Sequence, residues 1–200
     1  GDQIRSDLWI FPPNDFCNRG RAWWLDCHPE PVLIDCPPVN EGTIQLLKKL
    51  AGNRRPKIIL TSREAHGSIS ELNDSLDWPV LVQEQEAYLL PTISRLETFS
   101  DVFLTDSRLR LLWTPGPTPG SCIVHAEAPW NVVFCGRLLI PTKLNFLGAL
   151  RTGRTFHWPR QQKSLQKLRE FIPSDAFPRL ASGACLDLLE NDFLVPWDCW

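Results

Sequence analysis

The chain alternates short apolar runs with polar stretches that contain proline or glycine, a pattern typical of short buried strands joined by turns. These runs predict strands at residues 7–11, 22–25, 31–35, 57–61, 79–83, 98–103, 108–113, 123–126, 132–135 and 179–182. A helical period appears at Glu41–Ala51 and again at 160–171, where Leu165 and Leu168 would face inward. Shorter helices are predicted at 68–73 and 84–90, and 138–159 shows no clear period.

Strands and helices are mixed along the whole length, which favours sheets covered by helices over an all-β barrel. Two hundred residues are enough to bury a sizeable core without disulfides or metals. We therefore expect one α/β (α+β) domain that spans residues 1–200.

One loop has unusually restricted chemistry. Residues 114–121 read TPGPTPGS, in which three prolines fix φ and two glycines permit positive φ. A loop of this kind either holds a functional group at its tip or is a proline-rich surface turn, and the pattern favours neither.

Six segments together resemble, in order, the motifs of the metallo-β-lactamase fold hydrolases. The segments are VLIDCPP (32–38), IILTSREAHG (58–67), PGPTPGS (115–121), FCGRLL (134–139), SLQKLREF (164–171) and RLASGA (179–184). Each match is weak alone, whereas six in the family's order are specific. The resemblance implies a four-layer αββα sandwich of two mixed sheets with outer helices. The overall pattern is similar to short cyanobacterial and plastid members.

In that family, histidines and aspartates bind one or two metal ions that activate a water molecule. The resemblance places these ligand positions at Ser62, Glu64, His66, Gly67, Pro117, Arg137 and Gly183. Only Glu64 and His66 retain ligating side chains, fewer than the three protein ligands of a catalytic zinc site. We therefore expect no metal, no cofactor and no catalytic residue.

Arg137 would bring a fixed positive charge to the position that a metal ion occupies in the family. A buried charge needs a partner. We predict that its guanidinium pairs with Glu64 or the nearby Ser62.

These losses favour a non-catalytic member of the fold that serves as a binding or assembly module, with an unknown protein or small-molecule ligand as its partner. One alternative is a divergent metal-dependent hydrolase of ester, thioester or phosphodiester bonds with altered ligands. Another is a thiol protein that uses exposed cysteines.

Bulk properties limit the partners and the compartment. A net charge of −2 gives no electrostatic reason to expect nucleic acid or an anionic membrane, and no apolar run is long enough to span a bilayer. The seven cysteines form no C-x-x-C pair, so we expect reduced thiols in the cytoplasm. The oligomeric state stays open.

Four further residues are expected to be structural or inert. His125 reads as a core or surface histidine rather than a ligand, and His28 as solvent-facing in a turn. Cys135 is expected to be a buried, unreactive thiol, and Asp35 to brace the sheet, as its family counterpart does.

Two aromatic segments have open roles. Residues 151–163 combine Arg151, Arg154, Arg160 and Lys163 with aromatics. We favour an ordered loop whose aromatics pack on the core and whose charges face water over an anion or nucleic-acid contact. Residues 193–200 either bind a partner or pack back on the domain.

Overall fold

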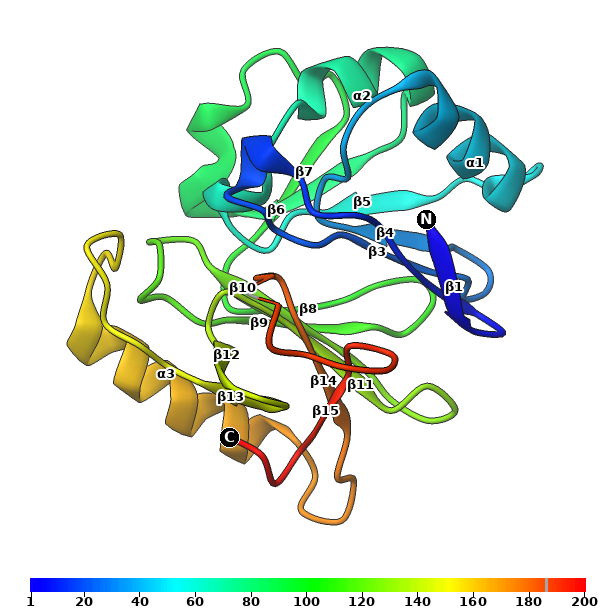
Figure 1. Ribbon diagram of the computed structural model, residues 1–200. Helices are drawn as coiled ribbons and strands as arrows, with labels where there is room; N and C mark the ends of the chain where they lie inside the picture. Colours follow the sequence, from blue (N-terminus) through cyan, green and yellow to red (C-terminus); the bar gives the residue numbers. More distant parts are fainter. Residues whose placement is uncertain (186) are drawn as a thin grey trace.

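The computed structural model describes residues 1–185 and 187–200, and two β-sheets stack face to face between outer helices (Figure 1). Helices α1 (Glu41–Ala51) and α2 (Ile69–Leu76) cover one sheet, and α3 (Trp158–Phe171) covers the other. This is the predicted αββα sandwich. None of the described helices has the length and apolar composition needed to cross a membrane.

The first sheet has seven strands in sequence order. They are β1 (Asp2–Arg5), β2 (Leu8–Ile10), β3 (Trp23–Leu25), β4 (Val32–Ile34), β5 (Lys57–Ile59), β6 (Val80–Gln83) and β7 (Leu96–Phe99). Pairing is antiparallel from β1 to β4 and parallel from β4 to β7. The parallel pairs require crossovers, which α1, α2 and the 3₁₀ helix η3 (Glu84–Leu89) provide.

The second sheet has the order β15-β14-β11-β10-β9-β8. Its strands are β8 (Val102–Leu104), β9 (Arg110–Trp113), β10 (Cys122–Ala126), β11 (Val132–Gly136), β14 (Arg179–Ser182) and β15 (Val195–Pro196). The one parallel pair among these described strands, β11 with β14, is connected through α3. A separate hairpin of β12 (Ile140–Lys143) and β13 (Phe146–Gly148) precedes that helix.

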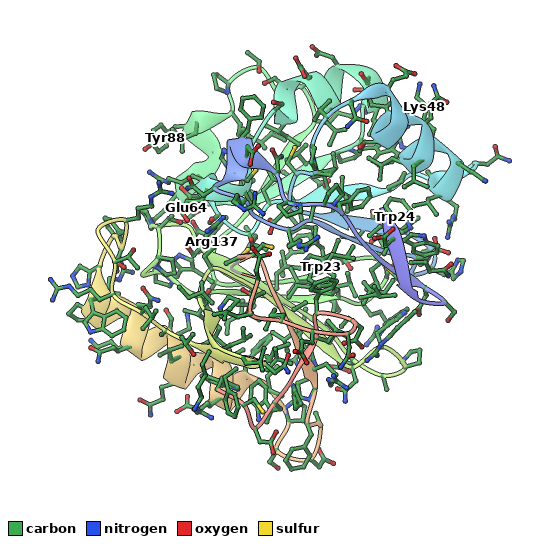
Figure 2. All side chains as sticks on the ribbon, in the orientation of Figure 1. Trp23, Trp24, Lys48, Glu64, Tyr88 and Arg137 are labelled. Carbon is green, nitrogen blue, oxygen red and sulfur yellow. The ribbon has the colours of Figure 1, made fainter. Side chains whose placement is uncertain are left out.

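Strand alternation divides the apolar residues among three core layers. Trp23 points between the sheets, where its ring meets Phe134 edge-on, whereas Trp24 points toward the helices and packs on Trp78 (Figure 2). Successive side chains of a strand face opposite sides. A sheet buried on both faces therefore needs the continuous apolar runs that the sequence shows.

Two parts of the strand prediction are wrong. Residues 98–103 are not one strand, because the chain turns at Ser100 and Asp101 and crosses from β7 in the first sheet to β8 in the second. The aperiodic stretch 138–159 contains the β12–β13 hairpin. Its register shift between Pro141 and Lys143 hides the period of two.

The two ends of the chain form edge strands that the pattern missed. β1 extends the first sheet and the two-residue β15 extends the second. After β15, Trp197 and Trp200 pack against the core beneath α3, and Arg169 of that helix lies over the Trp200 ring. The C-terminal aromatic segment therefore packs back on the domain.

The proline-rich loop is fixed against the start of α3. Phe156 N–H donates to the Pro117 carbonyl, His157 N–H to the Gly116 carbonyl, and the Ser164 hydroxyl to the Pro115 carbonyl. Gly116 has φ +146° and lies so close to the helix that a Cβ there would fall 2.3 Å from Gln161 Cα. Only glycine permits this approach.

We predict that Gly116→Ala lowers the free energy of unfolding by about 2–3 kcal/mol, because the added methyl group must displace helical backbone. Gly153→Ala is the matched control, since a Cβ at Gly153 meets nothing within 4 Å. Denaturant unfolding of both variants measures the difference. Equal stability of the two variants would contradict the close approach.

Candidate functional site

The candidate site lies at one edge of the sandwich, where the ends of β4, β5, β11 and β14 meet. Asp35, directly after β4, is buried and accepts hydrogen bonds from the Thr61 amide (2.8 Å) and hydroxyl (2.9 Å). Burial raises the pKa of this carboxyl to about 6, while the Thr61 hydrogen bonds and Arg137 act to lower it. Asp35 therefore joins β4 to β5, as expected from sequence.

The backbones of Gly136 and Gly183, which belong to different strand ends, pack closely together beside this aspartate. Gly183 N–H donates to the Gly136 carbonyl (2.7 Å), and the Gly183 carbonyl accepts from Arg21 N–H (2.9 Å). A Cβ at Gly136, which has φ +53°, would fall 2.7 Å from the Thr61 hydroxyl oxygen. The remaining cavity between these segments is only about 10 Å³, roughly the space of one water molecule.

The Arg137 side chain lies beside these closely packed glycine segments and contacts three residues of the first half of the chain. Its Nε lies 3.2 Å from Glu64 Oε2, and its Nη2 donates to the carbonyls of Cys17 and Asn18 (Figure 2). Arg137 and Glu64 are only 17% and 18% exposed, so the attraction is poorly screened. The guanidinium thus connects the end of β11 to two segments of the first half of the chain. Its pairing with Glu64 matches the contact predicted from sequence.

The other residues at the predicted ligand positions do not gather into a set of donors. The buried Ser62 accepts a hydrogen bond from Glu64 N–H, and Pro117 contributes a ring to the neighbouring cleft. His66 Nε2 is buried without a hydrogen-bond partner among the described residues, and burial lowers the pKa of this imidazole to about 4. Gly67 has φ +48°, and a Cβ there would fall 2.8 Å from Cys17 Sγ.

These residues do not fit a metal centre. Within residues 1–185 and 187–200, no three His, Cys, Asp or Glu side chains are placed to hold a metal ion. Glu64 is engaged by Arg137, and Arg137 places its own charge beside the site. A cation there would meet charge repulsion and too few ligands.

A buried ion pair that the sequence analysis did not identify holds the proline-rich loop from its other side. Glu86 of η3 is fully buried and accepts from Arg63 Nε (2.6 Å) and from the Thr118 hydroxyl (2.5 Å). A Cβ at Gly120 would fall 2.4 Å from Glu86 Cγ. Because the partners are 23 and 32 residues away from Glu86, no local motif could reveal them.

An open cleft of about 440 Å³ adjoins Arg137 on the side of α3. It is lined by residues from both halves of the chain: Glu64, Pro117, Arg137, Ile140, Leu150, Thr152, Gly153, Arg154, Thr155 and Gln161. Its volume falls within the range of on the order of 300–1,000 Å³ that is typical of small-molecule sites.

The 151–163 segment forms one wall of this cleft and only partly follows expectation. Arg151, Arg154 and Lys163 face solvent, as predicted. The expectation that its aromatics pack on the core is wrong for Phe156, which is 50% exposed. Its neighbour His157 instead caps α3, where its Nδ1 accepts from Arg160 N–H. The backbone amides of Phe156 and His157 are hydrogen-bonded to the carbonyls of Pro117 and Gly116 in the proline-rich loop.

The remaining candidate residues lie away from the site or are inert. His28 is exposed in its turn, as predicted. His125 is buried and its Nδ1 lies 3.1 Å from Arg110 Nη1; burial, with a smaller effect of Arg110, lowers its pKa to about 4.

Burial raises the pKa of Cys17, Cys27 and Cys135 to about 12, 11 and 12. These three thiols are therefore protonated and unreactive at neutral pH.

Comparison with known proteins identifies the fold. No protein-family model and no curated protein matches the sequence. The solved BLEG-1 B3 metallo-β-lactamase superposes with a TM-score of 0.69 at 20% identity, over 96% of this chain and 94% of its own. TTHA1623, solved in a di-iron-bound form, gives 0.68 at 19% identity over 88% and 92%. A quorum-quenching N-acyl homoserine lactone lactonase gives 0.63 at 18% identity over 92% and 93%. The chain has the metallo-β-lactamase fold.

We predict a coupling free energy of about 1–2 kcal/mol between Arg137 and Glu64 in a double-mutant cycle of Arg137→Met and Glu64→Gln, measured by denaturant unfolding. Partial burial strengthens the pair. The exposed pair of Arg95 and Asp77, at a similar 3.3 Å, is the control and should couple by no more than about 0.5 kcal/mol. Equal coupling in the two pairs would show that Arg137 is an ordinary surface arginine.

We also predict that His125 makes the fold sensitive to acid. Its folded-state pKa lies below the ordinary value, so the stabilisation is complete above pH 6.5 and is lost as pH falls toward 4. As pH falls from 6.5 to 4, the free energy of unfolding should decrease less steeply in His125→Asn than in the unsubstituted protein. The two slopes should differ by up to about 1.4 kcal/mol per pH unit. The exposed His28→Asn is the control, and an unchanged slope in His125→Asn would refute the assignment.

Proposed function

We propose that this chain is a non-catalytic, metal-free protein of the metallo-β-lactamase fold that acts as a binding module. The arrangement of Arg137 carries this proposal. Its guanidinium occupies the site as a covalently attached cation that forms an ion pair with Glu64 and donates hydrogen bonds to two backbone carbonyls. The binding surface would be the adjoining cleft.

The packing around Arg137 supports the same conclusion. The space between Cys17, Thr61 and Gly183 holds about 10 Å³, which leaves no room for a metal ion, its ligands and a reactive water together. At three of the former ligand-region positions, Gly67, Gly136 and Gly183, the chain has glycines, and an added Cβ there would force neighbouring atoms to shift.

The alternative is a hydrolase with altered ligands, and its two candidate ligands are poorly placed. Glu64 would have to leave Arg137, and the unpartnered His66 Nε2 is enclosed by protein. Thiol chemistry is also disfavoured at Cys17, whose carbonyl accepts a hydrogen bond from Arg137, because burial raises the pKa of its thiol to about 12.

We predict that protein purified without chelator contains less than about 0.1 zinc, iron or manganese ion per chain, because a metal site that assembles in the fold normally retains its ion. Elemental mass spectrometry measures the content. Chelator treatment should leave the thermal midpoint unchanged. A metallo-β-lactamase purified in parallel is the positive control.

Near-stoichiometric metal that is lost together in Glu64→Gln and His66→Asn would overturn the proposal and support the hydrolase. Metal that persists in both variants would also overturn it, and would place the metal site elsewhere in the chain.

A further inference from the structure

We propose that the cleft beside Arg137 binds a small organic anion with an apolar body, such as an alkyl phosphate or an alkyl carboxylate. This inference rests on the proposed function, since it takes Arg137 rather than a metal ion as a cation that lines the cleft. It adds the chemical class of the ligand.

The first observation is a free donor on Arg137 itself. Nε and Nη2 of its guanidinium are engaged by Glu64, Cys17 and Asn18, whereas Nη1 has no hydrogen-bond partner in the described part of the chain. Arg137 lines the cleft and is not fully buried. Its contacts hold the guanidinium in place, so a ligand that binds Nη1 need not order a flexible side chain.

The second observation is a further arginine, Arg154, among the residues that line the cleft. Arg154 lies in the loop after β13 and also lines the cleft. Its side chain forms no ion pair or hydrogen bond with any described residue. Among the described residues that line the cleft, Glu64 is the one carboxylate, and its charge is balanced by Arg137. The cleft therefore carries an excess positive charge that an anion would neutralise.

Hydroxyl groups beside Arg154 can complete the head-group site. Thr152 Oγ1 accepts from Arg154 N–H, and Thr155 Oγ1 accepts from Thr152 N–H. Each hydroxyl acts as an acceptor in these contacts, so its own hydrogen is available to donate to an anionic oxygen.

The other walls select for an apolar body. Pro117, Ile140 and Leu150 line the same cleft, and Leu150 is 48% exposed although it is a large aliphatic residue. Covering this surface would remove apolar area from water, a gain that inorganic phosphate cannot provide. Volume limits the ligand to a small molecule or to the end of a longer chain.

The charge on the segment strengthens the preference for anions. Arg151, Arg154, Arg160 and Lys163 lie within 13 residues that contain no acidic residue. They raise the local potential and the rate of encounter with anions, although the net charge of the whole chain is negative.

Isothermal titration calorimetry with hexyl phosphate and hexanoate tests the proposal on the chain of residues 1–200. We expect saturable binding of at least one of them and none of hexyltrimethylammonium. Arg154→Gln should weaken binding by about tenfold or more, through loss of a charge-assisted hydrogen bond. Arg151→Gln is the matched control: the same charge is removed three residues away, outside the cleft, and affinity should change less than about twofold.

Leu150→Ser separates the contribution of the apolar body from that of the head group. This substitution should lower the affinity for hexyl phosphate and leave any affinity for inorganic phosphate unchanged. Equal losses in Arg154→Gln and Arg151→Gln would indicate diffuse attraction and overturn the site. Inorganic phosphate that binds as tightly as hexyl phosphate would overturn the amphiphilic ligand. Metal-free protein that binds neither anion would refute this inference alone, whereas metal-loaded protein would refute the proposed function.

Discussion

The arrangement of the edge of the sandwich that holds the candidate site depends on the contacts of the Arg137 guanidinium. This guanidinium projects from the end of a strand in the second sheet and reaches a carboxylate and two carbonyls that belong to the first half of the chain. The hydrogen bonds to the two carbonyls are charge-assisted and therefore stronger than neutral ones, and partial burial of the ion pair with Glu64 limits competition from water. One side chain thereby fixes the 14–20 loop, the Ser62–Ala65 turn and β11 relative to one another.

Glycines surround Arg137 because the segments that meet there lie too close together to accommodate larger residues. The segments that surround Arg137 approach so closely that a Cβ at Gly20 would fall 3.0 Å from Arg137 Nη2 and 2.9 Å from the Cys17 carbonyl. A Cβ at Gly183 would fall 3.1 Å from the Gly136 backbone. Close packing of this type leaves little freedom for one segment to move without its neighbours. The proline-rich loop shows the same strategy, since Gly116 meets α3 and Gly120 meets Glu86 without side chains between them.

Sequence reasoning predicted what depends on local pattern or on a series of motifs. Continuous apolar runs identified the buried strands, and the motif order predicted the sandwich that the comparisons show. It also predicted the contact between Glu64 and Arg137, although these residues are 73 positions apart, because the family resemblance supplied the missing spatial information.

Features that arise only from tertiary packing were not predictable. The chain leaves one sheet and enters the other between Phe99 and Val102 without proline or glycine, so the strand pattern reads through the turn. The partners of Glu86 are contributed by two segments that are distant from it in the sequence, and Phe156 is 50% exposed in a segment whose aromatic residues were expected on the core. Residue type alone encodes none of these relations.

A cation that is part of the polypeptide differs from a bound ion in its thermodynamics. An ion that binds only the folded state adds stability in proportion to the logarithm of its free concentration, so folding depends on supply. Arg137 is present at a fixed effective concentration set by the chain itself, and it cannot dissociate or be exchanged for another ion. If the site is metal-free as proposed, the edge of this sandwich assembles in the same way whatever the composition of the surrounding metal pool.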